Sequence, residues 1–243
     1  GQDMVDACKL LGVDIMTGHW EFTYGMDRVR EIIERELPPI EFLAQNIMLT
    51  EDASFEGKPA FDEDSGRVFK PYSMREMNGI PVAIIGQAFP YTTIANPRYM
   101  MEDWSFGIRD EQCQAMVDEV RAKGAQVVVV LSHNGMDVDL KMATRVTGID
   151  VILGGHTHDG IPKPSVISNA GGQTLVVNSG SNTKFLSVMD LDVRDGRVAD
   201  YRFRLLPIFA NLLPADPEMA MFIEGAREPF KQQLDTVLAT TET

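Results

Sequence analysis

Two continuous apolar runs near the middle of the chain constrain its fold more than any other feature. They are "AQVVVVLS", residues 125–132, and "DVILGG", residues 150–155. Unbroken runs of β-branched residues predict strands buried on both faces, as in parallel sheets covered by helices. Helical spacing precedes each run, near 109–123 and 137–147. The order helix–strand–helix–strand therefore predicts a mixed, partly parallel α/β sheet with helices on its faces.

The rest of the chain supplies hairpins and further elements. Asn78-Gly79 lies between two strand-like runs and predicts an antiparallel hairpin with a type I′ turn, and Asp195-Gly196 joins the last two predicted strands. The spacing predicts helices at 3–11, 26–36 and 216–234, strands at 13–18, 40–47, 173–180, 185–193 and 197–208, an irregular excursion at 49–66 and a long loop at 90–107.

Composition excludes some classes of protein. The net charge of −14 argues against a nucleic-acid backbone as partner. No run approaches the roughly 18 apolar residues of a membrane-spanning helix. The two cysteines, Cys8 and Cys113, fall in predicted helices and are expected to be buried thiols, although a disulfide stays open. Both chain ends resemble internal cuts, so we expect a fragment, and the lack of a signal peptide carries no information on location.

Every histidine of the chain follows a predicted strand. The four are His19, His133, His156 and His158. Ligands of such sheets bind beyond the carboxyl ends of the strands, so His133, His156 and His158 are expected at one edge. In "GHTH", imidazoles at i and i+2 of an extended segment would reach different atoms of one site. Imidazole is a common ligand of Mn, Fe and Zn, so the pattern predicts a metal site rather than ordinary loop histidines.

Three motifs carry a resemblance to a known family. "GHWEFTYG", "VVVLSHNG" and "GGHTHDG" occur in the order of the metallophosphoesterase fold of the 5′-nucleotidase family. The family pattern runs D-x-H, G-D, G-N-H-E-F-D, S-H and G-H-x-H, so its first two motifs would precede residue 1. The resemblance implies a four-layer αββα sandwich truncated at the N-terminus. It also implies a partial catalytic domain at 1–213 and a helical linker at 214–243 toward a C-terminal domain.

The third motif departs from the family pattern. His19 stands where the family has a metal-binding Asn and is still a competent ligand. Trp20 replaces the catalytic His, and Thr23 replaces its Asp partner. Trp and Thr cannot exchange a proton at useful pH, so the metal site is retained whereas the His–Asp dyad is lost. This exchange, with "IGQAFPYTTIANP", resembles the thiosulfohydrolase branch of the family, from the bacterial sulfur-oxidation (Sox) system.

That branch implies a specific reaction. It releases sulfate from a cysteine S-thiosulfonate on the carrier protein SoxYZ, in the periplasm, with two divalent metal ions, expected to be manganese. By family position His19, His133 and His156 would bind the second metal and His158 the first, completed by upstream Asp and His ligands. Water activated by the metals, rather than a side chain, is the expected nucleophile. The fragment alone is expected to be inactive, because it lacks those upstream ligands.

Four further residues are candidates to line the site. Trp20 would face the channel of the carrier arm, or simply pack in the core. Glu21 would orient a histidine ligand, or be an ordinary loop carboxylate. Asn134 would bond a metal-bound oxygen, and Asn178 would face the site, although both also fit turn positions. Two other functions stay open: a 5′-nucleotidase or related phosphoesterase that works without the dyad, and a noncatalytic metal-binding module.

Overall fold

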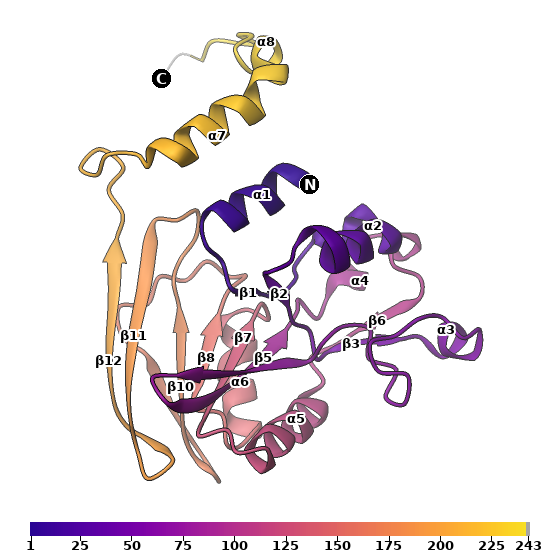
Figure 1. The fold of residues 1–243 in the computed structure, drawn as a ribbon, viewed down its shortest axis with the longest axis vertical. Coiled ribbons are helices and arrows are strands. Elements are labelled where there is room, and N and C mark those ends of the chain that lie inside the picture. The colour runs from indigo at the N-terminus through magenta and orange to yellow at the C-terminus, as the bar shows by residue number, and fades with distance from the viewer. Residues whose placement is uncertain (242–243) are drawn as a thin grey trace. The chain divides into compact units, whose positions relative to one another are not determined.

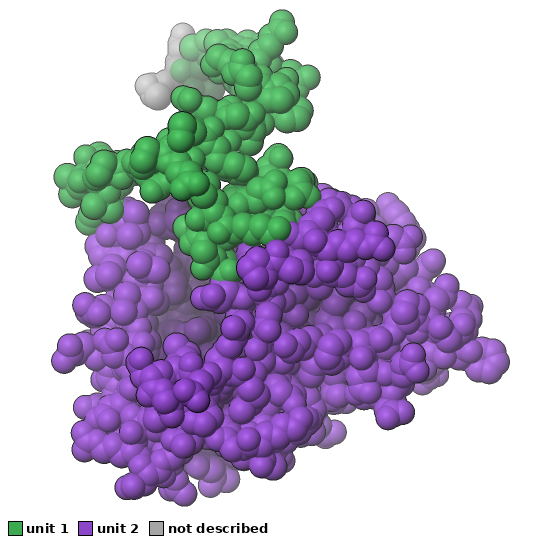
Figure 2. All heavy atoms as spheres, viewed as in Figure 1, with its two compact units in different colours: residues 1–13, 209–243 green, residues 14–208 purple. Residues whose placement is uncertain are grey.

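The computed structural model describes residues 1–241, which form two compact units (Figures 1 and 2). One unit is residues 14–208, and the other combines residues 1–13 with the chain from Phe209 onward. The last two residues of the predicted linker at 214–243 lie outside the described part of the chain. The division of the chain after residue 213 stays a prediction.

A six-stranded mixed sheet forms the centre of the larger unit (Figure 1). Its four inner strands run parallel, and both edge strands run antiparallel to their neighbours. The prediction of a partly parallel sheet is therefore confirmed. In spatial order the strands are β4 (Tyr72–Met77), β5 (Ile80–Gln87), β7 (Val127–Ser132), β8 (Val151–Gly154), β10 (Gly172–Asn178) and β9 (Ser165–Asn169).

Two helices pack on this sheet through one apolar cluster. They are α5 (Asp110–Ala122) and α6 (Met136–Arg145), close to their predicted bounds. Both contribute to a cluster with Val128 and Val130 of β7 and Ile152 of β8. Burying these side chains contributes roughly 1.5–3 kcal/mol each relative to exposure, so the strand ends that follow them are firmly placed.

The cysteines divide between the two units. Cys113 is fully buried in the core of the larger unit, as predicted, whereas Cys8 in the smaller unit is only partly buried. The expectation of two buried thiols is thus correct for Cys113 alone. Cys8 lies on α1 (Gln2–Leu10), a short helix with few neighbours to cover it.

The predicted strand at 40–47 is wrong as a single element. It splits into β2 (Glu41–Phe42) and β3 (Ile47–Leu49). Between them the backbone of Leu43 crosses β5 so closely that a Cβ on Gly86 would lie 2.1 Å from the Leu43 carbonyl oxygen. The crossing diverts the chain from one sheet to another, since β2 pairs with β1 (Ile15–Met16) and β3 pairs with β6 (Trp104–Phe106).

Several segments contain more regular structure than the sequence indicated. The excursion at 49–66 contains α3 (Glu51–Phe55), which Thr50 caps by accepting a bond from the Ala53 N–H at 3.3 Å. The loop at 90–107 contains α4 (Thr92–Ala95), a 3₁₀ turn at Arg98–Met100 and strand β6. Strand β9 was missed, because its exposed alternate positions weaken the apolar pattern.

Both predicted hairpin turns are confirmed. Asn78 and Gly79 have φ of 52° and 78°, the left-handed values that a type I′ turn needs. Asp195 and Gly196 have φ of 50° and 72° and join β11 (Phe185–Arg194) to β12 (Arg197–Pro207). These two long strands form a separate antiparallel sheet with many exposed positions.

Further helices complete both units. In the larger unit a 3₁₀ turn at Glu21–Tyr24 leads into α2 (Met26–Glu31), which continues as a π-helix at Ile32–Glu36 before the prolines. The other unit contains α7 (Pro217–Arg227), a 3₁₀ turn at Glu228–Phe230 and α8 (Lys231–Leu234). None of the described helices has the length and apolar character needed to cross a membrane.

Candidate metal centre

Three histidines reach one place because of where their strands end. His133 directly follows β7, and its N–H donates to the Gln87 carbonyl at the end of β5, at 2.8 Å. His156 follows the end of β8 by two residues. The loop of His19 is tied to the same edge, because the Phe89 N–H donates to the Gly18 carbonyl at 3.0 Å. The predicted convergence at the carboxyl edge therefore holds for His133 and His156, and His19 joins them from the loop after β1, which belongs to a separate two-stranded sheet.

The imidazoles of His19, His133 and His156 form a compact group. One ring nitrogen from each lies within 4.8 Å of the others. Ring centroids are 4.3 Å apart for His19 and His133, and 4.9 Å apart for His19 and His156. Within the described residues, Nε2 of His19, Nε2 of His133 and Nδ1 of His156 are buried and lack hydrogen-bond partners. Three converging nitrogens with free lone pairs fit a divalent metal ion.

The electrostatics of the group also suit a metal. Burial first, and then the neighbouring His156 and His158, lower the pKa of His19 to about 4. The pKa of His133 is likewise lowered to about 4, first by burial and then by His19. Burial and His158 lower the pKa of His156 as well. All three rings are therefore neutral near pH 7, the form that binds metals.

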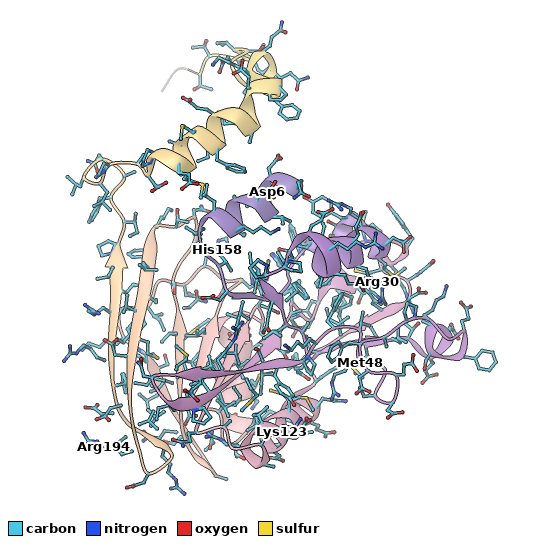
Figure 3. The ribbon with its side chains drawn as sticks, in the orientation of Figure 1. Asp6, Arg30, Met48, Lys123, His158 and Arg194 are labelled. Carbon is cyan, nitrogen blue, oxygen red and sulfur yellow. The ribbon has the colours of Figure 1, made fainter. Side chains whose placement is uncertain are left out.

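His158 lies outside this group. It is exposed, and it is visible beyond the end of the sheet where β8 stops (Figure 3). The prediction of an extended "GHTH" segment is wrong, because φ is 74° at His156 and 62° at His158. Such left-handed values are uncommon for residues other than glycine and cost of order 1–3 kcal/mol each. The segment is bent, and of its two histidines only His156 has a ring nitrogen within 4.8 Å of those of His19 and His133.

The first strand-end motif places Trp20 beside the group of three histidines. Its ring centroid lies 4.7 Å from that of His19, and 51% of the residue is exposed. Glu21 accepts a bond from the His19 backbone N–H at 2.5 Å, so it holds the loop of His19 rather than its ring. Thr23 donates its hydroxyl to the Trp20 carbonyl at 2.7 Å, which closes the turn.

The two candidate asparagines lie in different environments. Asn134 is buried, and its amide is engaged at both ends: Oδ1 accepts from Gln87 at 3.0 Å, and Nδ2 donates to Asp139 at 3.0 Å. Asn178 ends β10 and donates to the Gly155 carbonyl at 3.4 Å. Its Oδ1 is buried and has no partner among the described residues, so Asn178 keeps an acceptor near the "GHTH" segment.

Sequence reasoning missed Phe89, which covers the group of histidines. Its ring stacks on His156 with centroids 4.1 Å apart, and it meets His19 edge-on at 5.0 Å. Tyr91 packs against Phe89 at 5.8 Å and is itself partly exposed. The position of Phe89 just past the end of β5 was the available signal, since the other site residues also follow strand ends.

The molecule also has a cavity away from the group of histidines. A cavity of about 620 Å³ lies at the opposite end of the sheet, among residues such as Arg121, Asp150 and Arg197. Arg121 is already engaged there by Asp150 at 2.6 Å. Among the described residues, none of the buried polar atoms without a hydrogen-bond partner belongs to the lining of this cavity, so we assign no chemistry to it.

The chain is similar to known proteins in sequence and in fold. A solved structure of the sulfate thiohydrolase SoxB from Thermus thermophilus superposes with a TM-score of 0.85 and 34% identity, covering 98% of this chain and 41% of that chain. The rat 5′-nucleotidase is 29% identical over 191 residues, 76% of this chain and 31% of its own length. The trifunctional nucleotide phosphoesterase YfkN of Bacillus subtilis is 26% identical over 253 residues, 94% of this chain and 17% of its own length.

No protein-family model matches the sequence. The chain spans less than a third of the length of both curated relatives. The predicted fold class, a mixed α/β sheet with flanking helices of the metallophosphoesterase type, is confirmed by the likeness to SoxB. The relatives are hydrolases, which supports a hydrolase here. The chain therefore belongs to the 5′-nucleotidase/metallophosphoesterase family and is SoxB-like within it.

Proposed function

We propose that this chain carries part of the active site of a metal-dependent thiosulfohydrolase. The reaction hydrolyses a cysteine S-thiosulfonate on the SoxYZ carrier. Water adds to the sulfonate sulfur, the S–S bond breaks, and the persulfide leaves with the electron pair while sulfate and two protons are released. The 34% identity to a sulfate thiohydrolase over nearly the whole chain supports this substrate over a phosphate ester.

The position of Trp20 is the observation that carries the proposal. It stands where the resemblance implies the catalytic His of phosphoesterases, and it is half-exposed beside His19. An indole offers one N–H donor and no titratable group. A sulfonate carries less charge than a phosphate monoester, so its hydrolysis needs less help from a cationic dyad. Trp20 is therefore suited to shaping the pocket rather than to transferring protons.

We further propose that the site holds two divalent metal ions, manganese by family resemblance. His19, His133 and His156 would hold one ion, and His158 would contribute to the other. Bound metals would supply Lewis-acid stabilisation and activate water. The chain itself would orient the ligands: Glu21 fixes the backbone of His19, and Phe89 shields the ring of His156 from solvent.

Exposed aromatic side chains support access by a peptide-borne substrate. Trp20 lies next to the His19 ring and Tyr91 packs against Phe89, and both aromatic residues keep exposed surface. A shallow cavity of about 330 Å³ is lined by Tyr24, Tyr99 and Met100 among others. Flat aromatic faces bind extended backbone without needing charge. We propose that these surfaces receive the cysteine-bearing arm of SoxYZ, in the periplasm.

The test compares two substrates on one enzyme. The full-length protein encoded by the gene that contains these residues is loaded with Mn²⁺. Sulfate release from carrier cysteine S-thiosulfonate is measured, with AMP hydrolysis in parallel. We expect sulfate release without AMP turnover. Trp20→His should reduce sulfate release, whereas Phe55→His, at a fully exposed aromatic residue on α3, should not.

The opposite result would favour the second candidate. AMP turnover without sulfate release would make the protein a 5′-nucleotidase, as its 29% identity to the rat enzyme also permits. Activity of the 243-residue chain by itself is a separate measurement, and we propose that this chain alone is inactive. Turnover of either substrate by the chain alone would contradict that proposal.

A further inference from the structure

One buried carboxylate lies close to the three clustered histidines. Among the described residues it makes no hydrogen bond to their imidazole rings. Asp139 is on α6 and is fully buried. Its Oδ1 accepts bonds from the Ser132 hydroxyl at 2.6 Å and from Asn134 Nδ2 at 3.0 Å. Ser132 and Asn134 are the two neighbours of His133. A single oxygen atom therefore holds the backbone on both sides of a proposed metal ligand.

The bonds continue from Asn134 to the next strand. Asn134 Oδ1 accepts from Gln87 Nε2 at 3.0 Å, and Gln87 Oε1 accepts from Gln45 Nε2 at 2.7 Å. Gln45 and Gln87 are both completely buried. A buried polar chain of this kind is costly unless its members pair, and when paired it fixes one arrangement of the surrounding backbone. Here it fixes the ends of β5 and β7 against each other.

The second oxygen of Asp139 faces the strand of another ligand. Oδ2 is buried and has no hydrogen-bond partner among the described residues. A Cβ on Gly154 would lie 2.7 Å from it, so the carboxylate packs directly on the backbone that ends β8. His156 follows Gly154 by two residues. The same carboxylate thus bonds the two neighbours of His133 and packs on the backbone two residues before His156.

Packing alone does not account for an acid at this position. A buried carboxylate that lacks full pairing costs several kcal/mol compared with a well-packed apolar residue. Asp139 shares the buried face of α6 with Met142 and Ala143, where an apolar residue would serve stability better. The carboxylate of Asp139 is explained if the His133 loop and the end of β8 must keep one geometry.

We propose that Asp139 is a positioning residue, which holds the His133 loop and the end of β8 at the separation that lets His19, His133 and His156 share one divalent metal ion. The inference rests on the proposed metal-dependent function. Asp139 would touch neither metal nor substrate. Outer partners that orient metal ligands typically change metal affinity by about 10–100-fold when they are removed.

The experiment measures metal affinity and stability separately. Co²⁺ serves as the probe, since its visible absorption reports ligand geometry, and its affinity is measured by titration of the full-length protein that contains these 243 residues. The free energy of unfolding is measured without metal, in urea with a chelator. We expect Asp139→Ala to weaken Co²⁺ binding about 10–100-fold and to shift its absorption bands. Asp139→Asn keeps an acceptor for Ser132 and Asn134, and should recover most of the affinity.

Asp150 provides the matched control. It is another largely buried carboxylate of the same sheet, and its Oδ2 accepts from the Val128 N–H at 2.7 Å and from Arg121 at 2.6 Å. These contacts lie where β7 and β8 begin, away from the histidines. Asp150→Asn should lower the free energy of unfolding and leave Co²⁺ affinity and spectrum unchanged.

The outcomes separate the inference from the proposed function. Wild-type Co²⁺ affinity in Asp139→Ala would overturn the positioning role while leaving the metal site intact. Equal losses of affinity in Asp139→Ala and Asp150→Asn would also overturn it, because general destabilisation would then suffice. No Co²⁺ binding by the wild-type chain would overturn both the metal site and the inference. If Asp139→Ala does not fold, Ser132→Ala removes one of the two bonds to Oδ1 and should give a smaller loss with the same spectral shift.

Discussion

Two neighbouring loops carry the proposed metal ligands, and the structure holds the two loops by different means. The loop after β7 contains His133 and is held by side chains: Asp139 bonds the residues on both sides, and the His133 N–H reaches the end of β5. The loop after β8 contains His156 and His158 and is held in left-handed backbone conformations, φ 74° and 62°.

The difference assigns different roles to the two loops. The buried network on the first loop fixes one geometry through its hydrogen bonds, although Oδ2 of Asp139 has no partner among the described residues. Left-handed backbone at residues other than glycine persists only when the surroundings impose it. Hydrogen bonds on Thr157 supply part of that constraint: its hydroxyl accepts from the Met136 N–H at 3.0 Å, and its N–H donates to the Gly155 carbonyl at 3.0 Å. We infer that the first loop is preformed, whereas the second is completed by metal.

The largest effect should come from removing a ligand of the preformed loop. His133→Ala deletes one of three nitrogens that lie within 4.8 Å of one another. We expect Co²⁺ affinity to fall by more than the ~10–100-fold that outer partners cause. His158→Ala, at an exposed histidine outside the group, is the matched control and should cost much less. Isothermal titration of both variants checks this, and equal losses would show that His158 belongs to the same ion.

The preformed loop was largely predictable, because apolar runs define where strands end. "AQVVVVLS" located β7 and hence His133, and "DVILGG" located β8. The sequence also marks Asp139 as an unusual residue. It lies at the helical spacing of Met142, Ala143 and Val146, so an acid occupies a position of the apolar face. A charged residue on that face indicates a buried partner, but the sequence does not identify the partner.

The second loop was not predictable in the same way. Nothing in "GHTH" distinguishes an extended segment from one with two left-handed histidines, because positive φ is readable from sequence only where glycine or asparagine stands. The half-exposed position of Trp20 was also undecided, since tryptophan patterns equally with core and with binding surfaces. Such features depend on contacts distant in sequence, such as the bond from the Phe89 N–H to the Gly18 carbonyl.

Metal should change the second loop more than the first. Amide hydrogen exchange is followed on the chain with and without saturating Co²⁺. We expect protection to increase at residues 154–158 and to change little at 132–134, where the His133 N–H is already bonded to Gln87. At a concentration of 100 times Kd, binding stabilises the native state by about 2.7 kcal/mol, which sets an upper limit on the change. Equal gains in both loops would show that neither is preformed.

A smaller effect should follow from disturbing the contact between the loops. Gly154→Ala places a methyl group 2.7 Å from Asp139 Oδ2 and 3.1 Å from the Val177 carbonyl. Overpacking of this kind costs about 1–3 kcal/mol of unfolding free energy. Gly107→Ala is the control, since its added Cβ would meet only the Arg109 side chain, at 3.4 Å. Urea denaturation that finds both variants equally stable would mean that the two loops are not in tight contact.

The smallest effect isolates the backbone conformation of the second loop. His158→Gly and His158→Ala both delete the imidazole, but only alanine retains the Cβ that disfavours φ near 62°. The left-handed penalty of about 1–2 kcal/mol is partly offset by the greater entropy of glycine in the unfolded chain, about 0.5–1 kcal/mol. We therefore expect His158→Gly to be more stable than His158→Ala by up to about 1.5 kcal/mol without metal. Equal stabilities would mean that the metal-free loop already relaxes out of the left-handed region. Metal binding, rather than the protein alone, would then set the backbone conformation around His156.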